Sequence, residues 1–146
     1  PEPMKILRLI PLFLLAIFLQ ACDRYYADPL TRAENALEHK DYELAQTIAD
    51  SIISGQNFTR LGTTQLCRTA LVYAKLSEQR EQDANMGAAA LCMRRASELD
   101  SDSVELFVQQ LNVDDQAAIY MPRKLGNVTQ YELIPDESAD SAAYGI

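Results

Sequence analysis

Apolar residues recur every three or four positions through most of residues 29–112, which is the spacing of one face of an α-helix. The positions between them are mostly polar or charged, so each predicted helix has one face for a core and one for solvent. The pattern predicts an all-α protein of about five helices. They cover residues 29–40, 42–54, 64–77, 84–99 and 103–112.

The connections between these helices indicate antiparallel packing. Little more than Asp41 separates the first two helices, so they must fold back on each other as neighbours. Gly55 suits a left-handed cap after the second helix. We expect a loop to follow, with Phe58 and Leu61 folded onto the core. The polar segment 77–83 holds no Gly or Pro, so it is either an extension of the third helix or a loop.

Several helix starts carry capping residues. Asp28 followed by Pro29 fits the N-cap and first position of the first helix. Asp102 and Glu105 have the spacing of a capping box for the fifth helix. A further turn or two is expected to end before Pro122, because proline interrupts helical hydrogen bonding.

The segment before the helices has the organisation of a leader. Lys5 and Arg8 give it a basic start, and an apolar run of 11 residues follows from Leu9 to Leu19. A membrane-spanning helix needs about 20 residues, so this run has the length of a signal peptide. We interpret Met4 as the native start, and residues 1–3 as foreign to it.

The end of the leader resembles a bacterial lipobox, with aliphatic Leu19, variable Gln20, small Ala21 and then Cys22. The resemblance implies cleavage after Ala21 and lipidation of Cys22. Three acyl chains would anchor firmly, since two already give stable membrane binding. No cofactor other than this covalent lipid is expected. An ordinary signal peptide with a chance cysteine and an uncleaved anchor are the alternatives.

The residues after Cys22 suggest where the protein is found. Residues 22–28 would form a short tether that holds a periplasm-facing domain close to the bilayer. In one bacterial sorting rule, Asp23 next to the lipidated cysteine favours the inner membrane; the outer membrane stays open. The net charge of −8 disfavours nucleic acid as a partner and leaves membrane association to the lipid.

The helical region 29–112 also resembles tetratricopeptide repeats, in which small residues pack two antiparallel helices. One copy has Ala33, Ala36, Leu37, Asp41, Tyr42 and Ala45, and a second has Ala70, Tyr73, Leu76, Ala89, Met93, Ala96, Leu99 and Asp100. The second copy has about seven extra residues in its turn region, 78–85, and Ser101 replaces the usual proline. A generic helical bundle with similar small-residue contacts is the alternative.

The repeat resemblance implies a short solenoid of stacked antiparallel hairpins over residues 29–121. Such a solenoid offers a concave face to a peptide or partner protein. The groove residues implied by the resemblance are Leu30, Glu34, Leu37 and Glu38 in the first unit and Thr64, Leu71, Ala74 and Lys75 in the second.

Cys67 and Cys92 are the remaining cysteines, and an antiparallel hairpin centred near residue 79 places them opposite each other. An exported protein meets an oxidising compartment, so a disulfide is predicted. Such a bond would stabilise the fold by roughly 3 kcal/mol. Two buried free thiols are the alternative.

Other chemical motifs are weak, so no catalytic or metal site is predicted. His39 has no second histidine or thiol nearby, whereas zinc needs three or four ligands. The acidic segment 100–103 begins like a calcium loop, but Leu111 stands where a bidentate Glu is required. No nucleophile elbow or nucleotide fingerprint occurs.

The tail, residues 122–146, is interrupted by Pro and Gly and turns acidic. We expect it to be disordered. The weakly alternating segment 128–134 could instead order on a partner.

These features favour a lipid-anchored, periplasm-facing adaptor that binds a protein or peptide in the cell envelope, with no small-molecule substrate. A structural subunit of a larger envelope complex is the alternative. A small envelope enzyme is a third hypothesis, without a visible site.

The lipobox predicts that Cys22→Ala abolishes lipidation, because the thiol accepts the lipid. Metabolic labelling with a radioactive fatty acid should then give an unlabelled protein of precursor size. Normal processing and labelling of this variant would remove the lipoprotein hypothesis.

Overall fold

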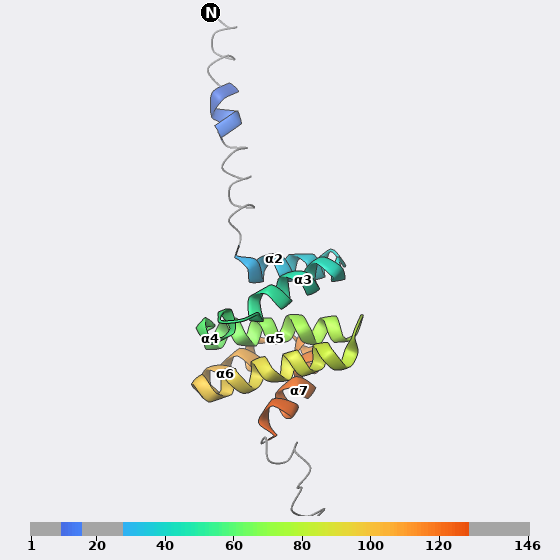
Figure 1. Cartoon of the computed structure of the whole chain (residues 1–146). Helices are drawn as coiled ribbons and strands as arrows, with labels where there is room; N and C mark the ends of the chain where they lie inside the picture. Colours follow the sequence, from blue (N-terminus) through green and yellow to red (C-terminus); the bar gives the residue numbers. More distant parts are fainter. Residues whose placement is uncertain (1–9, 16–27, 129–146) are drawn as a thin grey trace, which may run out of the picture.

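The computed structural model of the chain describes residues 10–15 and 28–128 (Figure 1). All regular secondary structure in these residues is helical. A short helix covers residues 10–15. The other helices are α2 (Pro29–Glu38), α3 (Tyr42–Ile53), α4 (Asn57–Arg60), α5 (Thr63–Ser77), α6 (Gln82–Gln110) and α7 (Val113–Asn127).

None of the described helices combines the length and apolar character needed to cross a bilayer. The lipobox, Leu19 to Cys22, and the tether as far as residue 27 lie outside the described residues. The tail from residue 129 onward lies outside them as well. The predictions made for those segments therefore remain predictions.

Helix α5 is the central helix of the body, because it contacts α2, α3, α6 and α7. The pairs α2–α3 and α5–α6 pack as neighbours, and α7 packs on α6 and α5 (Figure 1). The short helix α4 packs on α3. The expected all-α class is confirmed.

The core combines small residues with a few large ones. Ala33, Ala45 and Ala70 are wholly buried, which lets neighbouring helices approach closely. The apolar faces expected from helical spacing are therefore the faces that pack. The largest buried side chains are Tyr73, Leu66, Leu76, Met93 and Ile119.

The turn between α2 and α3 is set by backbone hydrogen bonds and by Asp41. Helix α2 ends at Glu38, two residues earlier than expected, and Lys40 takes a left-handed conformation with φ 58°. The Asp41 N–H donates to the Ala36 carbonyl at 2.8 Å and the Lys40 N–H to the Leu37 carbonyl at 3.0 Å, which closes the helix. The Asp41 carboxylate then caps α3 by accepting from the Leu44 N–H.

The predicted loop after Gly55 contains the one-turn helix α4. Gly55 has φ 56°, as expected for a left-handed residue after a helix end. Phe58 and Leu61 are half-buried against the core, as predicted. The polar segment 77–83 divides into the end of α5, a short turn and the start of α6.

The predicted fourth and fifth helices are joined into α6, with a kink at Asp100 (φ −163°, ψ 93°). The Asp100 carboxylate accepts from the Ser103 N–H at 3.1 Å and from the Ser103 hydroxyl at 2.6 Å. Asp100 therefore caps the second half of α6, which corrects the capping box predicted at Asp102 and Glu105. Glu105 instead pairs with Arg123 of α7.

Helix α7 is longer than predicted and continues through Pro122 to Asn127. Ile119, Pro122 and Gly126 are all buried, and their spacing places them on one face of the helix. Packing of this face offsets the hydrogen bond that proline removes. The domain therefore extends past residue 121, and the disorder predicted from residue 122 is wrong for residues 122–127.

Gly126 lets α7 approach the backbone of α6. A Cβ at this position would lie 2.7 Å from the Ala90 carbonyl oxygen and 3.0 Å from the Arg94 nitrogen. Both of these atoms belong to a helix backbone, so neither can move aside without shifting α6.

We therefore predict that Gly126→Ala destabilises the fold by about 1–3 kcal/mol through overpacking. Gly87→Ala is the matched control, because a Cβ there meets no atom within 4 Å. This control should stabilise by roughly 0.5–1 kcal/mol, since alanine favours a helix. Urea denaturation followed by circular dichroism measures both changes, and equal effects of the two variants would contradict the close approach.

Candidate functional site

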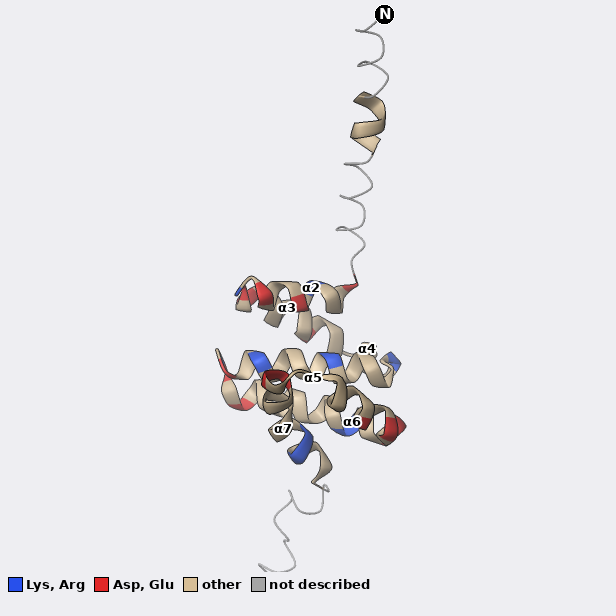
Figure 2. Ribbon diagram, turned by 180° about the vertical axis from the view of Figure 1, so that it is seen from behind, with Lys and Arg blue, Asp and Glu red and all other residues tan. Residues whose placement is uncertain are grey.

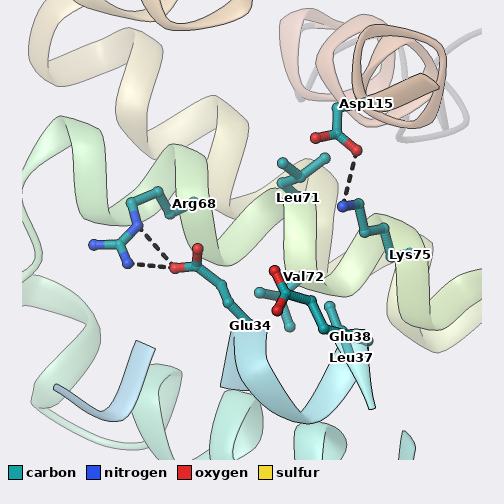
Figure 3. Close-up of a pocket in the computed structure, with 8 residues that line it drawn as sticks. All are labelled: Glu34, Leu37, Glu38, Arg68, Leu71, Val72, Lys75 and Asp115. Atoms are coloured by element: carbon teal, nitrogen blue, oxygen red, sulfur yellow. Dashed lines mark hydrogen bonds and ion pairs between the residues drawn. The ribbon is translucent and has the colours of Figure 1, made fainter. Parts of the chain in front are cut away.

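A cavity of about 280 Å³ lies between α2, α5 and the start of α7 (Figure 3). Its lining contains apolar side chains together with both signs of charge. The lining residues are Glu34, Leu37, Glu38, Arg68, Leu71, Val72, Lys75 and Asp115.

Helical spacing explains why these side chains share one cavity. Arg68, Leu71, Val72 and Lys75 follow the i, i+3, i+4, i+7 rule along one face of α5. The three residues from α2 have the same type of spacing. One face of each helix therefore contributes to the cavity.

Arg68 connects α5 to the start of α2. Its Nε donates to Glu34 Oε1 at 2.9 Å, and its Nη2 also bonds this carboxylate (Figure 3). The guanidinium reaches Asp28, with Nη1 3.8 Å from Oδ2. Arg68 thus brings together the carboxylate of Asp28, which precedes α2, and that of Glu34 within α2.

Lys75 connects α5 to α7. Its Nζ lies 2.8 Å from Asp115 Oδ1 (Figure 3). Asn112 caps α7 by accepting from the Asp115 N–H at 2.8 Å, which fixes the first turn of that helix. Both cations of the cavity are therefore held by carboxylates from neighbouring helices.

A second cavity, of about 640 Å³, adjoins the first and shares Leu37, Lys75 and Asp115 with it. We call the two together the α5 groove. The second cavity is further lined by Tyr42, Glu78, Gln79, Asn112, Asp114, Ala117 and Ala118.

The structure brings together five of the eight groove residues implied by the repeat resemblance. Glu34, Leu37, Glu38, Leu71 and Lys75 line the first cavity. The other three are corrected by the structure: Leu30 and Ala74 are buried in the core, and Thr64 is exposed outside the groove. Leu30 and Ala74 lie on helix faces that pack against neighbouring helices.

Sequence reasoning missed Arg68, Val72 and Asp115. The helical spacing from Leu71 and Lys75 could have indicated Arg68 and Val72, because all four share a face of α5. No local signal indicates Asp115, which reaches the cavity only because α7 packs across α5.

No protein-family model, curated protein or solved structure matches this chain. The functional proposal below therefore rests on the geometry of the α5 groove.

Other candidate centres have local structural roles in the described part of the chain. His39 Nδ1 lies 2.7 Å from the Asn35 carbonyl oxygen, so this ring closes the end of α2. Within residues 10–15 and 28–128, no cluster of three or more His, Cys, Asp or Glu side chains is arranged to hold a metal. The Ser103 hydrogen bonds lower the pKa of Asp100, consistent with capping by an ionised carboxylate.

Cys67 and Cys92 are buried free thiols, so the predicted disulfide is not formed in this structure. Burial raises the pKa of Cys67 to about 11 and that of Cys92 to about 12. Cys67 also contributes to the rise at Cys92, because a nearby negative charge disfavours a second one. The hairpin thus brings the two residues near each other, and their pairing remains a prediction for an oxidised protein.

We predict that Cys67 and Cys92 are alkylated slowly in the native protein at pH 8, because burial raises the pKa of both thiols. The thiolate is the reactive form, and a pKa raised from 9.0 to about 11 lowers its fraction by about a hundredfold. The native rate should rise as pH approaches the raised pKa. Thiol counting on denatured, unreduced protein distinguishes the two states. Two reactive thiols besides any unmodified Cys22 would show reduced cysteines, and their absence would establish the predicted disulfide.

Proposed function

We propose that this protein is a lipid-anchored adaptor of the bacterial cell envelope, and that its α5 groove binds a segment of a partner protein. The observation that carries the proposal is the groove itself. Side chains from four helices, α2, α3, α5 and α7, converge there on a partly apolar surface. Its second cavity, of about 640 Å³, has the size of many ligand sites, roughly 300–1,000 Å³.

Features of the fold support a short tetratricopeptide-like arrangement. Two helix pairs follow each other along the chain, and small residues at the matched positions, among them Ala33, Ala45 and Ala89, are wholly buried. Asp41 forms the turn between the first pair. The kinked α6 and the crossing of α7 over α5 depart from a regular repeat.

The lipobox supports a role close to the membrane. Even fully extended, the chain from Cys22 to Asp28 spans at most about 20 Å. The groove would therefore meet partners that lie near the bilayer, on the periplasmic side of the membrane that holds the lipid.

A structural subunit of a larger envelope complex is the second candidate, and α7 favours it. Val113 is 81% exposed and Tyr120 is 61% exposed, and their spacing of seven residues places them on the same face of α7. Exposed apolar surface of this kind is typical of protein contacts. This candidate places a permanent neighbour on α7, while the groove can stay empty.

The adaptor proposal predicts position-specific crosslinking in native membranes. A photo-reactive residue at Gln79 or Glu38, both lining the groove, should crosslink to the same partner protein. The same residue at Leu91 or Leu106, exposed on α6, should not. Mass spectrometry of the adduct identifies the partner segment.

Leu71→Asp should lower the adduct yield about tenfold, because it places an unpaired charge among the apolar side chains that line the first cavity. Leu106→Asp is the control for an added charge at an exposed apolar position. Thermal melting verifies that both variants fold. Crosslinking that is unaffected by Leu71→Asp, or that is strongest from Leu91 and Leu106, would contradict binding in the groove.

A further inference from the structure

We propose that the partner segment is basic, with lysine or arginine on either side of an apolar residue that enters the α5 groove. This inference rests on the proposed function and adds the chemistry of the partner. It follows from the balance of charge in the groove and from the apolar floor between the charges.

The groove has an excess of carboxylates. Arg68 and Lys75 are its two cations, and each already pairs with a carboxylate of the chain, Glu34 and Asp115 respectively. Figure 2 shows Lys and Arg positions along α5, with Asp and Glu positions on the neighbouring helices α2 and α3. The groove therefore has no unpaired cation, among its lining residues, to offer an acidic partner.

Three further carboxylates line the groove: Glu38, Glu78 and Asp114. All three are exposed, and none forms an ion pair within the described part of the chain. Glu38 is the last residue of α2, Glu78 follows the end of α5, and Asp114 lies in the first turn of α7. The three carboxylates are therefore distributed around the groove and do not cluster in one helical turn. A cationic segment would pair with them, and an acidic segment would be repelled.

The first cavity has an apolar surface between its two ion pairs. Leu37, Leu71 and Val72 line the first cavity, and Figure 3 shows Leu71 and Val72 between the two ion pairs. Tyr42, an aromatic residue of the kind that attracts cations, also lines the second cavity. An apolar side chain and neighbouring basic side chains thus each have a matching surface.

Three fluorescein-labelled peptides of equal length test the charge preference with the full-length protein in non-ionic detergent. One contains leucines and lysines, the second replaces its lysines by glutamates, and the third replaces its leucines by serines. Fluorescence anisotropy should show at least tenfold tighter binding of the first peptide than of the others. Stronger salt should weaken this binding, since exposed charges are screened.

A triple variant, Glu38→Gln, Glu78→Gln and Asp114→Asn, should weaken binding of the leucine–lysine peptide by about tenfold, because each exposed ion pair contributes a factor of roughly two. The matched control Glu43→Gln, Glu81→Gln and Asp102→Asn removes the same charge from exposed positions outside the groove and should leave the affinity unchanged. Equal weakening by both variants, preference for the glutamate peptide, or no binding by the leucine–lysine peptide would overturn the inference.

The crosslinking experiment separates this inference from the proposed function. An adduct from Gln79 with an acidic or neutral partner segment would overturn the basic partner and leave the adaptor role in place. If groove positions give no specific adduct, the adaptor role fails, whichever peptide the groove prefers.

Discussion

The packing of α5 against four other helices is the constraint on which the rest of the structure depends. Tyr73, at the centre of α5, is almost wholly buried, and its hydroxyl donates to Asp50 of α3 at 2.7 Å. Gln46 of α3 donates to the same carboxylate and, at 2.9 Å, to Asn85 of α6. This partly buried network forms only when α3, α5 and α6 are in register.

The register fixed in the core also sets the groove. One side of α5 carries Tyr73 toward α3, while the side with Arg68, Leu71 and Lys75 faces α2 and the start of α7. A shift of α2 and α3 against α5 would therefore disturb the buried network and the groove together. For this reason we expect the groove to be largely preformed rather than assembled by a partner.

The two ion pairs of the groove contribute little to the stability of the fold, and their main effect is on the charge of the groove. Arg68 and Lys75 are both partly exposed, and pairs of this type contribute roughly 0–1 kcal/mol. Burial of alanine, leucine and methionine side chains stabilises the fold more than these pairs do. The pairs neutralise both groove cations, so that the remaining carboxylates determine which partner charge is favoured.

The sequence by itself determined α2, α3 and α5, the turn at Asp41 and the left-handed Gly55, because these depend on local spacing and local hydrogen bonds. It also placed Leu37, Leu71 and Lys75 at a common surface, through the repeat resemblance. Only the tertiary structure decided that α7 continues through Pro122, that Gly126 meets the backbone of α6 and that Asp115 reaches Lys75. Each of these depends on how α7 crosses α5 and α6, a contact between distant segments that no local pattern encodes.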